Sequence, residues 1–183
     1  MNICECLTTT AKLFPDRIAV VFGDRQWTFR ELEQKSQAAA AVFQQHDIKP
    51  GDRVALMLPN APSFPVWYYG ALRIGAIAVS VSTRLAAGEV AFVVDDSGAK
   101  AFVASTGAMS SVEAELPAHA EFRLAVDEFG EPTEDAGNDF ASASYQDVYN
   151  AEPNEAALIL YTSGTTGFPK LSLIHISEPT RPY

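Results

Sequence analysis

The sequence predicts an α/β fold, a mostly parallel sheet with helices on both of its faces. Two observations support this prediction. Short runs rich in β-branched residues alternate along most of the chain with amphipathic segments of helical period, a pattern typical of strands joined by crossover helices. In addition, residues 157–161 form an unbroken apolar run, as expected of a strand buried on both faces of a parallel sheet.

The composition is that of one globular domain, or slightly more than one. The 183 residues are 48% hydrophobic and 20% charged, which excludes a disordered chain. The net charge of −10, from 13 basic and 23 acidic residues, disfavours a nucleic acid or an anionic membrane as the main partner. The most apolar window, 64–81, contains Arg73, which would cost about 2.5 kcal/mol or more at a bilayer centre. No transmembrane segment is therefore expected.

Cysteine usage indicates a reducing compartment. Cys4 and Cys6 are the two cysteines, with no second pair and no histidine nearby to complete a metal site. We interpret them as reduced thiols. Glu5 stands where a secretory signal would carry basic residues, and no long apolar stretch follows it. The prediction is a cytoplasmic protein without a metal site.

The first expected elements are a hairpin and a capped helix. Ile18–Phe22 and Gln26–Phe29 flank a turn at Gly23, which predicts two antiparallel strands. Thr28 and Glu31 have the spacing of a capping box, in which each side chain bonds a backbone N–H at the start of a helix. A helix with one apolar face is therefore expected to follow.

Strands and helices are then expected in alternation. In the helix at 63–74, Phe64, Trp67 and Tyr68 share one face, which predicts packing against the sheet rather than a substrate tunnel. The segment Asp127–Ser144 is acidic and has no lysine or arginine, so a solvated surface loop without a function is expected. The expected strands are 53–58, 76–81, 100–104, 122–126 and 157–161, and the expected helices are 63–74, 87–96 and 110–116.

A loop rich in hydroxyls and glycines follows the last of these strands. In a parallel sheet, ligands bind beyond the carboxyl ends of the strands, which is where this loop begins. Glycines let backbone N–H groups approach an anion closely, hydroxyls donate hydrogen bonds to phosphate oxygens, and a lysine adds positive charge. The candidate phosphate-binding residues are Thr162, Ser163, Gly164, Thr165, Thr166, Gly167 and Lys170.

The residues alone leave a second interpretation open. The loop lacks Walker A spacing, because Pro169 stands where that motif needs a glycine, and it lacks the G-x-G-x-x-G pattern. A Ser/Thr/Gly-rich surface turn after a core strand is the structural alternative.

Residues 161–170, which read YTSGTTGFPK, resemble the phosphate-binding signature of the adenylate-forming superfamily. This superfamily contains acyl-CoA synthetases, nonribosomal-peptide adenylation domains and firefly-type luciferases. The resemblance extends over residues 14–170 and is most similar in layout to free-standing fatty-acid and other carboxylic-acid CoA ligases. Upstream segments that also resemble the opening of these enzymes are 15–20, 51–56, 72–76 and 96–100.

The resemblance implies a two-step reaction that uses ATP, Mg²⁺ and coenzyme A. A carboxylic acid, here a fatty acid, attacks the α-phosphorus of MgATP to give an acyl-adenylate and pyrophosphate, and the thiol of coenzyme A then displaces AMP. The seven candidate residues would hold the β- and γ-phosphates and stabilise the departing pyrophosphate. Two alternatives stay open: an amino-acid adenylation domain that delivers to a carrier protein, and a non-catalytic α/β module that binds phosphate or a nucleotide.

The resemblance ends at Lys170. The superfamily continues with a glycine and then a Thr-His pair, whereas residues 171–183 resemble a translated adapter used in DNA library preparation. His175 therefore receives no role. We expect residues 1–170 to be the incomplete N-terminal portion of the large adenylation domain and residues 171–183 to be a non-native tail.

The resemblance places the catalytic lysine, the magnesium-binding glutamate and most of the acyl pocket beyond residue 170. No catalytic residue is therefore assigned in this chain, and the chain alone is expected to be inactive. The strand at 157–161 is expected to lack its following helix and some of its sheet neighbours, which would leave strand edges uncovered.

Overall fold

The computed structural model describes residues 2–133, 140, 142–152, 154–162 and 170–175, with side chains as far as Tyr161. Its centre is a six-stranded sheet with the strand order β6-β5-β3-β4-β7-β8. Strands β3 to β7 are parallel, and β8 pairs antiparallel with β7. This sheet confirms the predicted α/β class. The strands are β3 (Arg53–Met57), β4 (Ile77–Ser80), β5 (Ala101–Ser105), β6 (Phe122–Val126), β7 (Ala156–Thr162) and β8 (Lys170–His175).

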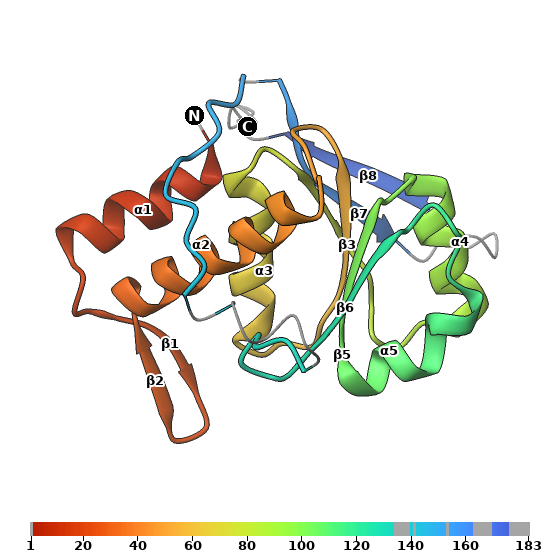
Figure 1. Ribbon diagram of the computed structural model, residues 1–183, viewed down its shortest axis with the longest axis horizontal. Coiled ribbons are helices and arrows are strands. Elements are labelled where there is room, and N and C mark those ends of the chain that lie inside the picture. The colour runs from red at the N-terminus through yellow and green to blue at the C-terminus, as the bar shows by residue number, and fades with distance from the viewer. Residues whose placement is uncertain (1, 134–139, 141, 153, 163–169, 176–183) are drawn as a thin grey trace, which may run out of the picture.

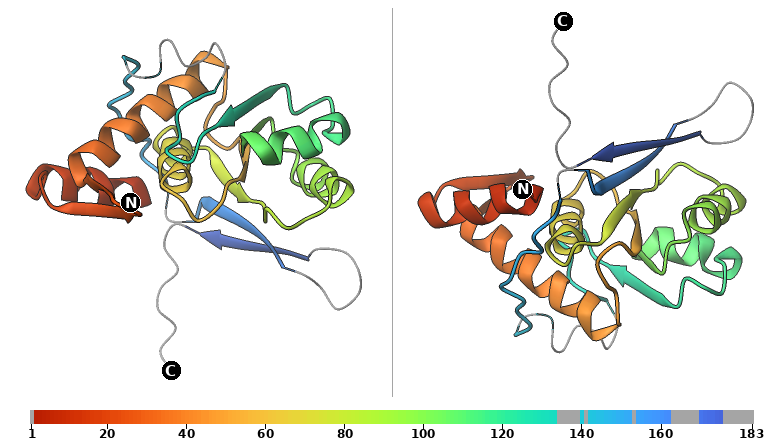
Figure 2. Two further views of the ribbon diagram at one scale, coloured as in Figure 1. Left: turned by 90° about the horizontal axis from the view of Figure 1, so that it is seen from below. Right: turned by 90° about the horizontal axis from the view of Figure 1, so that it is seen from above.

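Helices cover both faces of the sheet, as Figures 1 and 2 show. α2 and α3 lie on one face with α1 packed outside them, and α4 and α5 lie on the other face. The connection β3-α3-β4 moves along the sheet in one direction and β4-α4-β5 moves back past β3. Right-handed crossovers in opposite directions place their helices on opposite faces. The helices are α1 (Ile3–Leu13), α2 (Phe29–Gln45), α3 (Ser63–Arg73), α4 (Ala87–Ser97), α5 (Thr106–Val112) and the 3₁₀ turn η1 (Glu113–Glu115).

The core is divided in two by the sheet, and β3 contributes to both parts. Val54 and Leu56 pack on the side of α2 and α3, whereas Ala55 and Met57 pack on the side of α4 and α5. All four side chains are at most 2% exposed. The unbroken apolar run in this strand thus reflects burial on both faces, because successive side chains point to opposite sides of a strand.

The aromatic face of α3 packs against the sheet, which confirms its assignment to the core. Trp67 is fully buried, and Phe64 and Tyr68 are half-buried against the same core. Phe43 of α2 meets the Trp67 ring edge to face, with 5.2 Å between the ring centroids. These rings therefore fix the spacing between α2 and α3 rather than lining a tunnel.

The acidic segment Asp127–Ser144 packs in part against this core, so its prediction as a solvated surface loop is wrong there. The indole Nε1 of Trp67 donates a hydrogen bond of 3.0 Å to the carbonyl oxygen of Gly130. Phe140 is 2% exposed and stacks on the same indole, with 5.7 Å between centroids. Average composition hides such single aromatic residues, which join the core although their neighbours are charged.

The predicted hairpin and capped helix are confirmed. β1 (Ile18–Phe22) and β2 (Arg25–Thr28) pair antiparallel and project from the body beside α1 (Figure 1). The hydroxyl of Thr28 accepts the backbone N–H of Glu31 at 3.2 Å, and the Glu31 carboxylate accepts the N–H of Thr28 at 2.7 Å. Both halves of the capping box are therefore formed at the start of α2.

Helix α1 was not expected from the sequence. It begins at a cap in which the side-chain oxygen of Asn2 accepts the N–H of Cys4 at 2.9 Å, and it buries Cys4 and Leu7. Three consecutive β-branched threonines at 8–10 lower its intrinsic helix propensity. Tertiary packing against α2 and α3 supplies the stability that the local sequence lacks.

Strand β7 differs from its prediction in two ways. It has neighbours on both edges, β4 and β8, so the expectation of missing sheet partners is wrong. It is also fully buried on one face only: Ala157 and Ile159 are buried, whereas Leu158 and Leu160 are half-buried. Figure 2 shows β7 and β8 on the outer side of the sheet, beyond the strands that the helices cover best. β8 was not expected, since it lies in the stretch taken as a tail.

Arg73, at the end of α3, is fully buried and ion-paired. Its Nη2 lies 2.6 Å from the Glu33 carboxylate of α2 and donates to the Thr8 hydroxyl of α1 at 3.2 Å. Its Nη1 donates to the carbonyl oxygen of Gln146 at 3.1 Å. One guanidinium thus joins three helices. Within the part of the chain that the structure describes, no helix combines the length and the apolar character needed to cross a membrane.

Gly75, just after α3, is expected to tolerate no side chain. Its φ of +79° lies in the left-handed region, and an added Cβ would lie 2.6 Å from the Tyr149 ring. We expect Gly75→Ala to lower the free energy of unfolding by about 2–4 kcal/mol in urea denaturation, from backbone strain plus steric overlap. Gly107 in α5 is the matched control, because an added Cβ meets no atom within 4 Å, and Gly107→Ala should stabilise by about 0.4–1 kcal/mol. Equal stability of the two variants would contradict this expectation.

Candidate functional site

The candidate site lies at the carboxyl edge of the parallel sheet. Because β3 to β7 run in one direction, the turns that follow these strands reach the same edge. The helices after β3 and β4 lie on opposite faces (Figure 1), so the strand order reverses there and opens the crevice in which α/β proteins bind ligands. β7 lies directly beside β4. The hydroxyl- and glycine-rich loop therefore begins next to this crevice.

The structure brings the two ends of that loop together. Thr162 is the last residue of β7 and Lys170 is the first of β8, and these two residues are register partners in the antiparallel pair. Ser163, Gly164, Thr165, Thr166 and Gly167 lie outside the described residues. The loop thus closes on itself across a single pair of strands. That closure holds the backbone of Lys170 beside the start of the loop, as a shared anion would require.

Tyr161, immediately before the loop, is tied to α4. Its hydroxyl donates a hydrogen bond of 2.7 Å to the carboxylate of Asp96, and its ring packs on the core formed by α4 and α5. Partial burial and the neighbouring Asp96 carboxylate both raise the pKa of the Tyr161 phenol, so the phenol keeps its proton and stays a donor at neutral pH. Sequence analysis did not find this contact, because the two residues are far apart in the chain.

Arg84 is a second residue that sequence analysis did not single out. It lies exposed in the turn between β4 and α4, at the same edge of the sheet as the loop, on the strand that neighbours β7. Its backbone N–H donates to the Ser82 hydroxyl at 3.3 Å. A cation soon after a strand of a parallel sheet is the signal that could have marked it.

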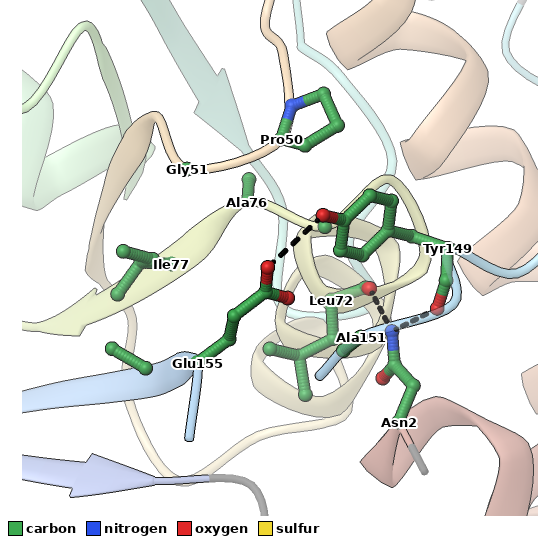
Figure 3. Close-up of a pocket in the computed structure, with 11 residues that line it drawn as sticks. Asn2, Pro50, Gly51, Leu72, Ala76, Ile77, Tyr149, Ala151 and Glu155 are labelled. Carbon is green, nitrogen blue, oxygen red and sulfur yellow. Dashed lines mark hydrogen bonds between the residues drawn. The ribbon is translucent and has the colours of Figure 1, made fainter. Parts of the chain in front are cut away.

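A cavity of about 170 Å³ lies at the opposite, amino edge of the sheet, among residues that precede or begin β3, β4 and β7. Figure 3 shows its polar groups bonded to one another: Tyr149 donates to the Glu155 carboxylate at 3.2 Å, and the Asn2 amide donates to the carbonyl oxygens of Leu72 and Tyr149 at 2.7 and 3.1 Å. These side-chain donors are thus directed at the protein itself rather than at a ligand. The cavity is therefore not part of the candidate site.

The charged side chains offer no ready metal centre. Across the described residues, no group of three or more histidine, cysteine, aspartate or glutamate side chains could hold a metal ion. Cys4 and Cys6 are both free thiols, and burial raises the pKa of Cys4 to about 11. A thiol with so high a pKa is a poor nucleophile at neutral pH.

Comparison with known proteins agrees with this layout. The sequence model of the family described as "AMP-binding enzyme" matches residues 7–177. The solved N-terminal domain of FACL13 from Mycobacterium tuberculosis superimposes on this fold with a TM-score of 0.80 at 30% identity, covering 95% of this chain and 44% of that one.

Three curated relatives differ in what their names say they act on or make. The long-chain-fatty-acid–CoA ligase FadD13 of Mycobacterium tuberculosis is 34% identical over 161 residues, 85% of this chain and 30% of FadD13. The 2-succinylbenzoate–CoA ligase of Bacillus velezensis is 35% identical over 165 residues, 90% and 31% of the two chains. A plipastatin synthase chain of Bacillus subtilis is 29% identical over 169 residues, 92% and 6%. The chain thus spans about a third of the length of the two ligases.

Proposed function

Because the chain belongs to the AMP-binding enzyme family, we propose that it is the phosphate-binding front part of an ATP-dependent carboxylate–CoA ligase. The observation that carries the proposal is the place of the sequence YTSGTTGFPK. It leaves the carboxyl end of a parallel strand beside the sheet's crevice, with Thr162 and Lys170 paired across its two ends. A chain of phosphates lying along such a loop meets donors at both ends.

The loop residues bind and orient the triphosphate of ATP. Backbone N–H groups at Gly164 and Gly167 and the four hydroxyls between residues 162 and 166 surround the β- and γ-phosphate oxygens without adding negative charge. Lys170 adds a positive charge where charge develops on the leaving pyrophosphate, which lowers the barrier to attack on the α-phosphorus. These residues bind the leaving group, and no proton transfer or thiol transfer is assigned to this chain.

Mg²⁺ belongs to the proposal as a partner of the ATP phosphates. The protein carries a net charge of −10, so a bare triphosphate would enter an unfavourable field. The described residues contain no cluster of metal-binding side chains. We infer that the ion arrives bound to ATP, where it neutralises phosphate charge.

The acid is proposed to be a fatty acid, and the acceptor coenzyme A. FadD13 supports this assignment by its name, and the 2-succinylbenzoate ligase shows that the acyl group varies among relatives of similar identity. The match to the plipastatin synthase favours one second candidate, the activation of an amino acid for transfer to a carrier protein.

Acid-dependent ATP–pyrophosphate exchange tests this function. The protein to assay is residues 1–170 followed by the continuation of their gene, supplied in parallel with fatty acids, aromatic acids and amino acids. We expect exchange with fatty acids and an acyl-CoA product, and no exchange by the 183-residue chain alone. Exchange driven by amino acids without a CoA product would favour the second candidate. If no acid supports exchange, the proposed function is wrong.

The extent of the enzyme is a separate proposal. We propose that residues 1–170 are the native portion and that residues 171–183 are not, although the family match reaches residue 177 and β8 extends to His175. Antiparallel backbone pairing of an edge strand accepts many sequences. Sequencing the gene past codon 170 should reveal a glycine codon and several hundred more, whereas finding codons 171–183 followed by a stop would contradict this boundary.

A further inference from the structure

The hydrogen bond between Tyr161 and Asp96 joins the last described side chain before the loop to helix α4. At 2.7 Å, it has the length of a hydroxyl bound to a charged carboxylate, about twice as strong as a neutral hydrogen bond. Tyr161 also packs on the core between the sheet and α4. The bond therefore fixes the direction of the side chain as well as the depth of its ring.

Asp96 occupies a position that helix electrostatics disfavour. It lies in the last turn of α4, where the helix dipole repels a carboxylate, and the last turn carries no basic residue. Local departures from such rules are typical of positions selected for another purpose. The structure gives Asp96 one such purpose, because its carboxylate accepts the Tyr161 hydroxyl.

A second tyrosine–carboxylate pair holds the other end of β7. Tyr149 donates to Glu155, the residue directly before Ala156, at 3.2 Å (Figure 3). The two pairs therefore anchor the same strand at its amino end and at its carboxyl end. Only the pair at the carboxyl end, Tyr161 with Asp96, adjoins Thr162 and the loop.

We propose that Tyr161 is a positioning residue for phosphate binding: its hydrogen bond to Asp96 holds the carboxyl end of β7 against α4, so that the loop leaves the sheet in the orientation that binds a polyphosphate. This inference rests on the proposed function of the loop. Tyr161 itself touches no phosphate. It acts through the strand end that Thr162 and Lys170 share, and so its removal weakens binding without removing any donor.

Calorimetric titration of the full 183-residue chain with magnesium tripolyphosphate tests this proposal. The variants are Tyr161→Phe, Asp96→Ala and Asp96→Asn, with Tyr149→Phe as the matched control that loses the equivalent bond at the far end of β7. We expect about five- to tenfold weaker affinity for Tyr161→Phe and for Asp96→Ala, and no further loss when both are combined. Asp96→Asn keeps an acceptor oxygen and should restore most of the affinity, and Tyr149→Phe should bind like the wild type.

The outcomes separate this proposal from the one on which it rests. A role in stability alone would lower the melting temperature of both tyrosine variants and leave both affinities unchanged, which would overturn the positioning role. Equal loss of affinity in Tyr161→Phe and Tyr149→Phe would overturn it as well. If the wild-type chain binds no tripolyphosphate, or binds it equally well after Thr165→Ala and Lys170→Ala, the loop assignment itself fails and the positioning role fails with it.

Discussion

Replacing Thr165 and Lys170 together by alanine is expected to slow acid-dependent ATP–pyrophosphate exchange by more than about 10³-fold. The two substitutions remove a hydroxyl donor from the loop and the cation that follows it. Both groups are proposed to bind the pyrophosphate as it leaves, when its charge is largest, so their loss weakens the transition state more than the bound ground state. The assay uses residues 1–170 with the continuation of their gene, as above.

The matched control replaces a threonine and a lysine that lie far from the loop. Thr9 and Lys12 are both exposed on α1, and their replacement by alanine should leave the exchange rate within about twofold of the wild type. A double loop variant that exchanges as fast as this control would show that residues 162–170 do not bind the leaving group.

Arg73→Met is expected to destabilise the protein by about 3–5 kcal/mol. The side chain of Arg73 is 0% exposed and that of its partner Glu33 is 11% exposed. Removing the cation leaves the Glu33 carboxylate in a low-dielectric interior without a counter-charge, and it also removes the donors that Thr8 and Gln146 accept. A loss of this size is a large fraction of the stability of a typical domain. Urea denaturation followed by circular dichroism measures it.

A double-mutant cycle and a surface pair supply the controls. Arg73→Met combined with Glu33→Gln should cost less than the sum of the two single changes, because the second change removes the stranded charge. The exposed pair of Arg30 and Asp16, with side chains 55% and 84% exposed, should contribute only about 0–1 kcal/mol. Additive single losses at Arg73 and Glu33, or equal costs at the buried and exposed pairs, would contradict this role for Arg73.

Much of the fold could be predicted because its signals are local. The capping box at Thr28 and Glu31 marks the start of α2 within one residue, and the apolar run of β3 correctly indicates burial on both faces. The same reasoning misjudged β7, because an apolar run does not reveal how many helices reach the outer part of a sheet. It missed α1, whose stability comes from packing against α2 and α3 rather than from its threonine-rich sequence.

The chemistry of the candidate site was also readable from local sequence, whereas its supports were not. The run from Thr162 to Lys170 carries its own donors in order along the chain. By contrast, Asp96 and Tyr161 meet only because β7 returns to lie beside β4, and Arg73 argued against a membrane helix without revealing that Glu33 is its partner. Contacts that depend on the strand order cannot be deduced from periodicity.

A ³¹P NMR titration of MgATP with the 183-residue chain measures directly whether residues 162–170 hold the triphosphate. Binding of the β- and γ-phosphates by the loop predicts that their resonances shift and broaden as protein is added, with a smaller effect on the α-phosphorus. The same titration with the Thr165→Ala, Lys170→Ala variant should leave all three resonances unchanged. Unperturbed β and γ resonances with the wild type, or equal perturbation by both proteins, would contradict phosphate binding by this loop.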